Sequence, residues 1–233
     1  MFDVTGDVQY LDWAVGTAKA AFREGGHGFY LINMPLRQSI ETLRRVGRGQ
    51  DADELLGHYR EVAANYLKNG LLVPKSEVNY EQSIIAPAAN FLCEMYLVTK
   101  DEQYKAGVEK MLPAVEAFNG RQPSWHLNDV AIRHWDGFWF GKQQLYGDTF
   151  PHYWSCITAD LFGNWAEATG CKSYRRRASE ICKANLGLFT ETERGGAAYM
   201  YPNLLNGNPG RYLDAMANDQ DFALVFASRW LAD

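Results

Sequence analysis

The sequence predicts an all-α protein built of antiparallel helical hairpins, and two observations carry this prediction. Four segments place their apolar side chains on a single helical face. These segments alternate with others that are richer in apolar and small residues, as expected for helices buried on more than one side. With 233 residues, of which 47% are hydrophobic and 22% charged, the chain can bury a sizeable core.

The four one-faced helices are expected to form an outer layer. Their apolar residues recur mostly three, four or seven positions apart, which aligns them along one side of an α-helix. The same pattern returns along the chain as an internal repeat. The predicted buried positions are Tyr10, Ala14, Thr17, Ala18 and Phe22; Leu55, Tyr59, Val62, Ala63 and Tyr66; Tyr104, Val108, Met111, Leu112, Val115 and Phe118; and Tyr174, Ala178, Ile181, Cys182 and Phe189.

The helices between them are expected to form an inner layer, roughly over residues 30–46, 80–98, 151–169 and 214–231. Three of them end in the short turns VGRGQD, VTKDEQ and ATGCKS, which are of the kind that joins antiparallel helices. The predicted order is therefore outer, inner, outer, inner, through four hairpins in a single domain spanning residues 1–233. The third repeat is lengthened by an insertion over residues 120–150.

This insertion and the residues after it gather aromatic rings, histidines and carboxylates ahead of an inner helix. Loops rich in aromatic residues commonly hold them for a ligand. The alternative is that these rings only plug one end of a helical barrel, since aromatic residues are more often core than site. Both interpretations stay open at this point.

Composition and charge exclude several classes of protein. The net charge of −5 and the pI near 5.6 provide no basic stripe for nucleic acid. Glu94, Lys100 and Asp160 interrupt the longest apolar runs, so no membrane span is expected, and the N-terminus shows no signal peptide, although one could have been removed. The compartment, cytoplasmic or exported, therefore stays open. The sequence predicts neither a metal nor a cofactor, because its four cysteines lack CxxC spacing and are expected to be buried free thiols.

The alternating helix types, the TKDEQY turn and the segment YGDTFPHYWS before an inner helix resemble the six-hairpin glycosidase superfamily. The resemblance covers almost the whole chain and implies an α/α toroid, in which six inner helices are ringed by six outer ones. Only four hairpins are visible in this sequence. An incomplete (α/α)6 barrel is therefore expected, closed by a missing segment or by self-association.

The resemblance places an active cleft at the N-terminal ends of the inner helices, and a carbohydrate as its substrate. Hydrolysis of a glycosidic bond needs two carboxyl groups, for which Asp148 and Glu81 are the candidates. Each has a structural alternative. Asp148 could cap a helix, and Glu81 could serve only the positive end of its helix dipole.

A β-elimination lyase is the second hypothesis, with His152 and Tyr153 as proton-transfer groups. Against this pair, neighbouring residues of a helix do not share a face. A non-catalytic helical-repeat binding protein is the third hypothesis. The basic run Arg175 to Arg177 is predicted to be a solvated face. The substrate-binding candidates are Trp125, His126, Asn128, His134, Trp135, Asp136, Trp154, Gln82, Arg211 and Asp219.

Overall fold

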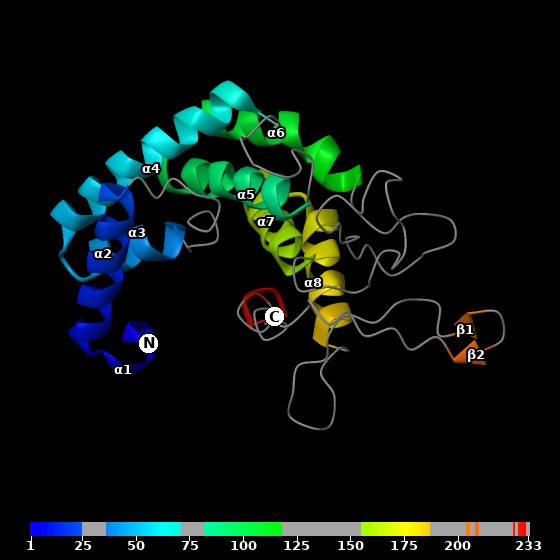
Figure 1. Cartoon of the computed structure of the whole chain (residues 1–233), viewed down its shortest axis with the longest axis horizontal. Helices are drawn as coiled ribbons and strands as arrows, with labels where there is room; N and C mark the ends of the chain where they lie inside the picture. The colour runs from blue at the N-terminus through cyan, green and yellow to red at the C-terminus, as the bar shows by residue number, and fades with distance from the viewer. Residues whose placement is uncertain are drawn as a thin grey trace.

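The chain folds as an all-α protein, an arc of an α/α toroid, in a computed structural model (Figure 1). The structure describes residues 1–24, 36–70, 82–117, 155–186, 204–205, 208–209, 226 and 228–231. The outer helices are α2 (Val8–Arg23), α4 (Gly49–Asn69), α6 (Glu102–Ala117) and α8 (Lys172–Leu186). The inner helices are α3 (Leu36–Arg45), α5 (Gln82–Thr99) and α7 (Ser155–Thr169).

Within the described residues, three inner-to-outer hairpins stand side by side. Helices α3 and α4, α5 and α6, and α7 and α8 pack against each other in pairs, and α5 also packs against both α3 and α7. In Figure 1 the outer helices α4 and α6 follow the outside of the arc, while α5 lies inside it. The predicted alternation of outer and inner helices is thus confirmed for these pairs.

Two of the turns that join inner to outer helices have the same structure. In one, the hydroxyl of Thr99 donates to a carbonyl of α5 and accepts the backbone N–H two residues later; in the other, Thr169 does the same on α7. In each turn, the residue after the threonine has a left-handed backbone conformation: Lys100 has φ 60° and Gly170 has φ 74°. This shared geometry confirms the repeat that the turn sequences predicted.

The buried residues lie on the predicted apolar faces of the outer helices, except on α2. All five predicted residues of α4 are buried, and so are four of the six predicted for α6. The buried face of α2 differs: Ala14 and Thr17 are exposed, and Leu11 and Val15 are buried instead. The prediction was wrong by about one residue, because alanine and threonine were counted as apolar markers where the larger Leu and Val decide which face is covered.

Two further predictions for the α8 region were wrong. Arg177 is not solvated: its guanidinium lies 4.3 Å from the ring centre of Phe162, and its Nη1 donates to Glu116 Oε1 at 2.7 Å. A long arginine side chain can be buried when an aromatic face and a carboxylate meet it. Of the four free thiols, Cys171 is exposed, because it lies in the turn before α8.

Three smaller elements are α1 (Phe2–Thr5), β1 (Leu204–Leu205) and β2 (Asn208–Pro209). The two strands pair antiparallel, with Leu204 opposite Pro209. None of the described helices combines the length and the hydrophobicity needed to cross a membrane. The division into a single domain with an insertion, and closure of the ring by self-association or a missing segment, stay predictions.

Candidate functional site

The inner helices α5 and α7 run parallel, and polar side chains connect them in a regular register. Asn90 Nδ2 on α5 donates to Asp160 Oδ2 on α7 at 2.8 Å, and Asn164 Nδ2 donates back to Asn90 Oδ1 at 2.8 Å. A longer contact of 3.4 Å joins Asn164 Nδ2 to Glu94 Oε1. Asn90 and Glu94 lie one turn apart on α5, and they meet Asp160 and Asn164 in the same order along α7. The two helices therefore run in the same direction, and their N-terminal ends lie on the same side of the arc.

Two residues near the C-terminus complete this group. Arg229 Nη1 lies 3.1 Å from Asp160 Oδ1, and its Nη2 donates to Asn164 Oδ1 at 2.6 Å. Trp230 Nε1 donates to Asp160 Oδ1 at 2.8 Å. We call these six residues the inner polar cluster: Asn90, Glu94, Asp160, Asn164, Arg229 and Trp230.

The cluster holds two buried carboxyl groups close to one guanidinium. Burial raises the pKa of Glu94 to about 7, and the negative charge of Asp160 adds to this rise. The backbone N–H of Arg37 at the start of α3, 3.0 Å from Glu94 Oε2, and the charge of Arg229 oppose it. Burial also raises the pKa of Asp160, while Arg229, Trp230 and Asn90 lower it. Like charges in a shared buried site disfavour ionisation of both groups at once.

Enclosure limits what the cluster can do chemically. Glu94 is 2% exposed, Asp160 4% and Asn164 0%, and hydrogen bonds from protein groups reach both carboxyl groups and the Asn164 side chain. A polysaccharide could not reach these atoms without parting the helices. The cluster therefore connects α5, α7, the start of α3 and the segment around Trp230.

Close packing holds Trp230 in place. A methyl group added at Gly163 of α7 would lie 2.4 Å from the indole of Trp230, closer than carbon atoms approach. The guanidinium groups of Arg175 and Arg229 lie 4.8 Å and 4.5 Å from the ring centre. The indole N–H is therefore aimed at Asp160 by contacts on several sides.

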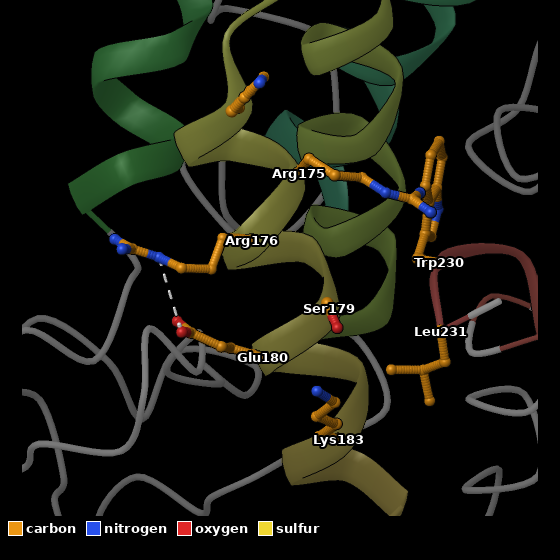
Figure 2. Close-up of a pocket in the computed structure, with 8 residues that line it drawn as sticks. Arg175, Arg176, Ser179, Glu180, Lys183, Trp230 and Leu231 are labelled. Atoms are coloured by element: carbon orange, nitrogen blue, oxygen red, sulfur yellow. Dashed lines mark ion pairs between the residues drawn. The ribbon is translucent and has the colours of Figure 1, made fainter. Parts of the chain in front are cut away.

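A hollow of about 550 Å³ opens on the surface beside Trp230 (Figure 2). The Arg175 side chain points from α8 toward the indole, and Arg176 pairs with Glu180 at 3.7 Å. Four of the lining side chains are cationic and one is acidic. The lining residues are Lys172, Arg175, Arg176, Ser179, Glu180, Lys183, Trp230 and Leu231.

The predicted site residues lie almost entirely outside the described residues. Only Gln82 is placed, as the first residue of α5, and its side chain is not described. The structure therefore neither brings the others together nor separates them. Those outside the described residues are Glu81, Trp125, His126, Asn128, His134, Trp135, Asp136, Asp148, His152, Tyr153, Trp154, Arg211 and Asp219.

Sequence reasoning missed the inner polar cluster. Glu94 and Asp160 were noted only as interruptions of apolar runs. The signal that could have found the cluster is a pair of polar residues four positions apart within each apolar inner helix, Asn90 with Glu94 and Asp160 with Asn164. As for metals, the part of the chain that the structure describes holds no group of three or more His, Cys, Asp or Glu side chains placed to bind one.

Comparison with solved structures relates this chain to a polysaccharide lyase. A solved structure described as a polysaccharide lyase aligns with 99% of this chain, at 46% sequence identity and a TM-score of 0.84. The aligned region is 34% of that structure's chain, so the present chain spans about a third of its length. No protein-family model matches the sequence, and no curated protein matches it. The match agrees with the α/α-toroid fold that the structure shows.

Proposed function

We propose that this chain is part of the α/α toroid of a polysaccharide lyase of the six-hairpin glycosidase superfamily. One observation carries the proposal: the 46% identity to a polysaccharide lyase over 99% of the chain. Identity at this level over more than two hundred residues is far above what a shared fold alone requires. The identity favours β-elimination. Hydrolysis is the first expectation from the sequence, and the identity supports it less.

The substrate proposed is a polysaccharide that contains uronate residues. In β-elimination a base removes the C5 proton of the uronate, its electron pair forms the C4–C5 double bond, and the C4–O bond breaks. The leaving oxygen then takes a proton from an acid. A third group must neutralise the uronate carboxylate, because this lowers the pKa of the C5 proton.

Four residues of the predicted cleft suit these tasks. His152 and Tyr153 are proposed as the base and the acid, and His126 and Asn128 as the groups that meet the carboxylate. The parallel register of α5 and α7 supports a common cleft. Glu81 is the residue before α5 in the sequence, and Trp154 is the residue before α7, so segments with candidate residues enter both helices from one end.

The first test incubates the full chain with a panel of neutral and uronate-containing glycans. Reducing ends and the ultraviolet absorbance of unsaturated uronates are recorded together. The proposal predicts that both signals rise in parallel on at least one uronate glycan. New reducing ends without absorbance would contradict it and would indicate hydrolysis, with Asp148 and Glu81 as the carboxyl pair. Neither signal on any glycan would favour a binding protein.

A second test assigns the proton-transfer role. His152→Ala is expected to lower kcat by a factor of about 100 or more, as is typical when a general acid or base is removed. The matched control is His58→Ala, because His58 lies on the outer helix α4, stacked on Phe22 at 4.8 Å. Equal activity of both variants would remove His152 from the mechanism.

A further inference from the structure

We infer that the inner polar cluster is a positioning device for catalysis: Asn90, Asp160 and Asn164 fix the axial register of α5 and α7. Through this register they hold in alignment the two helix starts that follow predicted catalytic segments. The inference rests on the proposed function for the reaction whose groups are positioned. The residues act through the helices and do not touch the substrate.

The hydrogen bonds are specific for one register. Asn90 donates to Asp160 with its amide nitrogen and accepts from Asn164 with its carbonyl oxygen, both at 2.8 Å. A shift of α7 by one helical turn, about 5.4 Å, would bring Cys156 or Asn164 opposite Asn90 and would separate Asp160 from the Asn90 amide. Buried polar groups that lose their partners are costly, whereas apolar faces tolerate sliding much better. The polar bonds therefore select the register that apolar packing alone leaves less defined.

The neighbours of Asp160 reinforce this choice. Trp230 and Arg229 both reach its Oδ1 atom, while Asn90 occupies Oδ2. The indole can approach because the residue that it faces on α7 is Gly163. Glu94 meanwhile accepts the backbone N–H of Arg37 at the start of α3. The cluster thus connects the start of α3 with residues within α5 and α7. An active cleft formed by these inner helices needs such a rigid scaffold.

The distances along the helices make the coupling direct. Asn90 lies eight positions after the first residue of α5, and Asp160 lies five positions after the first residue of α7. At about 1.5 Å per residue, both are within about 12 Å of the helix starts. A helix transmits a shift along its axis with little loss over so short a length. A displacement of about 1 Å at reacting groups can lower a rate by about a hundredfold.

The decisive experiment exchanges the two partners. Asn90→Asp alone sets two carboxyl groups against each other, and Asp160→Asn alone can set two amide nitrogens against each other. In the double variant N90D/D160N, the amide at 160 donates to the carboxylate at 90, so the bond returns with its direction reversed. Each single variant is expected to lose at least tenfold in kcat with KM changed less than threefold. The double variant is expected to recover to within threefold of the wild type.

A matched control separates positioning from stability. Leu161→Ala truncates a fully buried side chain next to Asp160 and removes no atom of the polar bonds. It is expected to lower Tm as much as the single exchanges do, but to keep kcat within about twofold when all variants are assayed well below their Tm. A purely structural role would make kcat follow Tm in every variant.

The outcomes distinguish this inference from the proposed function. A wild-type chain with no eliminase activity on any uronate glycan would overturn both. An active wild type whose single exchanges keep full kcat would overturn only the positioning role. Single variants that lose kcat without recovery in the double variant would also overturn it, because the register bond would then not be the cause. Loss of kcat in both single variants, with recovery of kcat in the double variant, establishes the positioning role.

Discussion

Two sets of interacting polar residues can be compared directly: the inner polar cluster between α5 and α7, and the network of ion pairs between the outer helices α2 and α4, which we call the exposed network. In the exposed network Lys19 Nζ lies 2.7 Å from Asp51 Oδ1 and 2.6 Å from Glu54 Oε2. Arg48 pairs with Asp51 at 2.7 Å and also with Asp12. The contacts in the network are as short as those in the cluster. The side chains of the network, however, are accessible to water.

Contact distance alone does not measure how much a polar group contributes to stability. In the exposed network solvent screens the charges and replaces a lost partner. The carboxyl groups and amides of the cluster are buried, so each bond that one of them loses leaves a buried polar group unsatisfied. The cluster is therefore expected to determine helix geometry, and the network to affect it little. Three changes test this comparison.

The largest effect is expected from Asp160→Ala. The substitution leaves the indole N–H of Trp230 and the amide N–H of Asn90 without the acceptor that Asp160 provides, and it removes one of the two carboxylates that pair with Arg229. Removing one partner of a buried charged group typically costs about 3–5 kcal/mol. Urea unfolding followed by circular dichroism measures the loss. A loss below about 1 kcal/mol would show that water enters the cluster and that it is not different in kind from the exposed network.

The second effect concerns the pH dependence of stability. The pKa of Glu94 rises from its ordinary 4.5 to about 7 in the folded chain, mainly because of burial. Below pH 4.5 the group is protonated in both states, and its contribution is fully present. As the pH rises toward 7, the unfolded state releases the proton that the folded state retains, so stability is lost, by up to about 3 kcal/mol.

Glu94→Gln should remove most of this dependence, because the amide resembles the neutral carboxyl group and does not titrate. The free energy of unfolding of the wild type and the variant, measured by urea titration from pH 4 to pH 8, gives the comparison. The variant is expected to gain stability relative to the wild type as the pH rises. Parallel curves for the two proteins would contradict the raised pKa of Glu94.

The smallest effect is expected in the exposed network. Arg48→Met removes the pairs with Asp51 and Asp12 and should cost less than about 1 kcal/mol, because both carboxylates remain hydrated. The cost should shrink further in about 1 M salt, which screens exposed charges. A large, salt-independent loss would mean that Arg48 contributes through packing, and it would weaken the contrast with the cluster.

The fold was largely predictable from the sequence, for reasons visible in particular residues. Leu55, Tyr59 and Tyr66 lie on one face of α4 because the helical period dictates it, and they are buried as predicted. The turns at Lys100 and Gly170 were recognised because turn chemistry is local. The face of α2 was misjudged, because its alanines and threonine discriminate poorly between buried and exposed positions.

The candidate site was much less accessible to sequence reasoning. The predicted catalytic residues, Asp148 and Glu81 for hydrolysis or His152 and Tyr153 for elimination, lie outside the described residues and stay predictions. The buried position of Arg177 was not predictable from its own segment, because it depends on Phe162 and Glu116 from other helices. A single sequence does not show which distant partner will satisfy a charge.

The helix types, their alternation and their turns follow from local sequence, because helical period and turn chemistry act over a few neighbouring residues. The contact of Asn90 with Asp160, seventy positions away, and the hydrogen bond of Trp230 to the same carboxyl group depend on the tertiary structure. Such pairing depends on how the helices pack and on the register that they adopt. Burial then gives these few bonds their weight, since a polar group removed from water must find its partner within the protein.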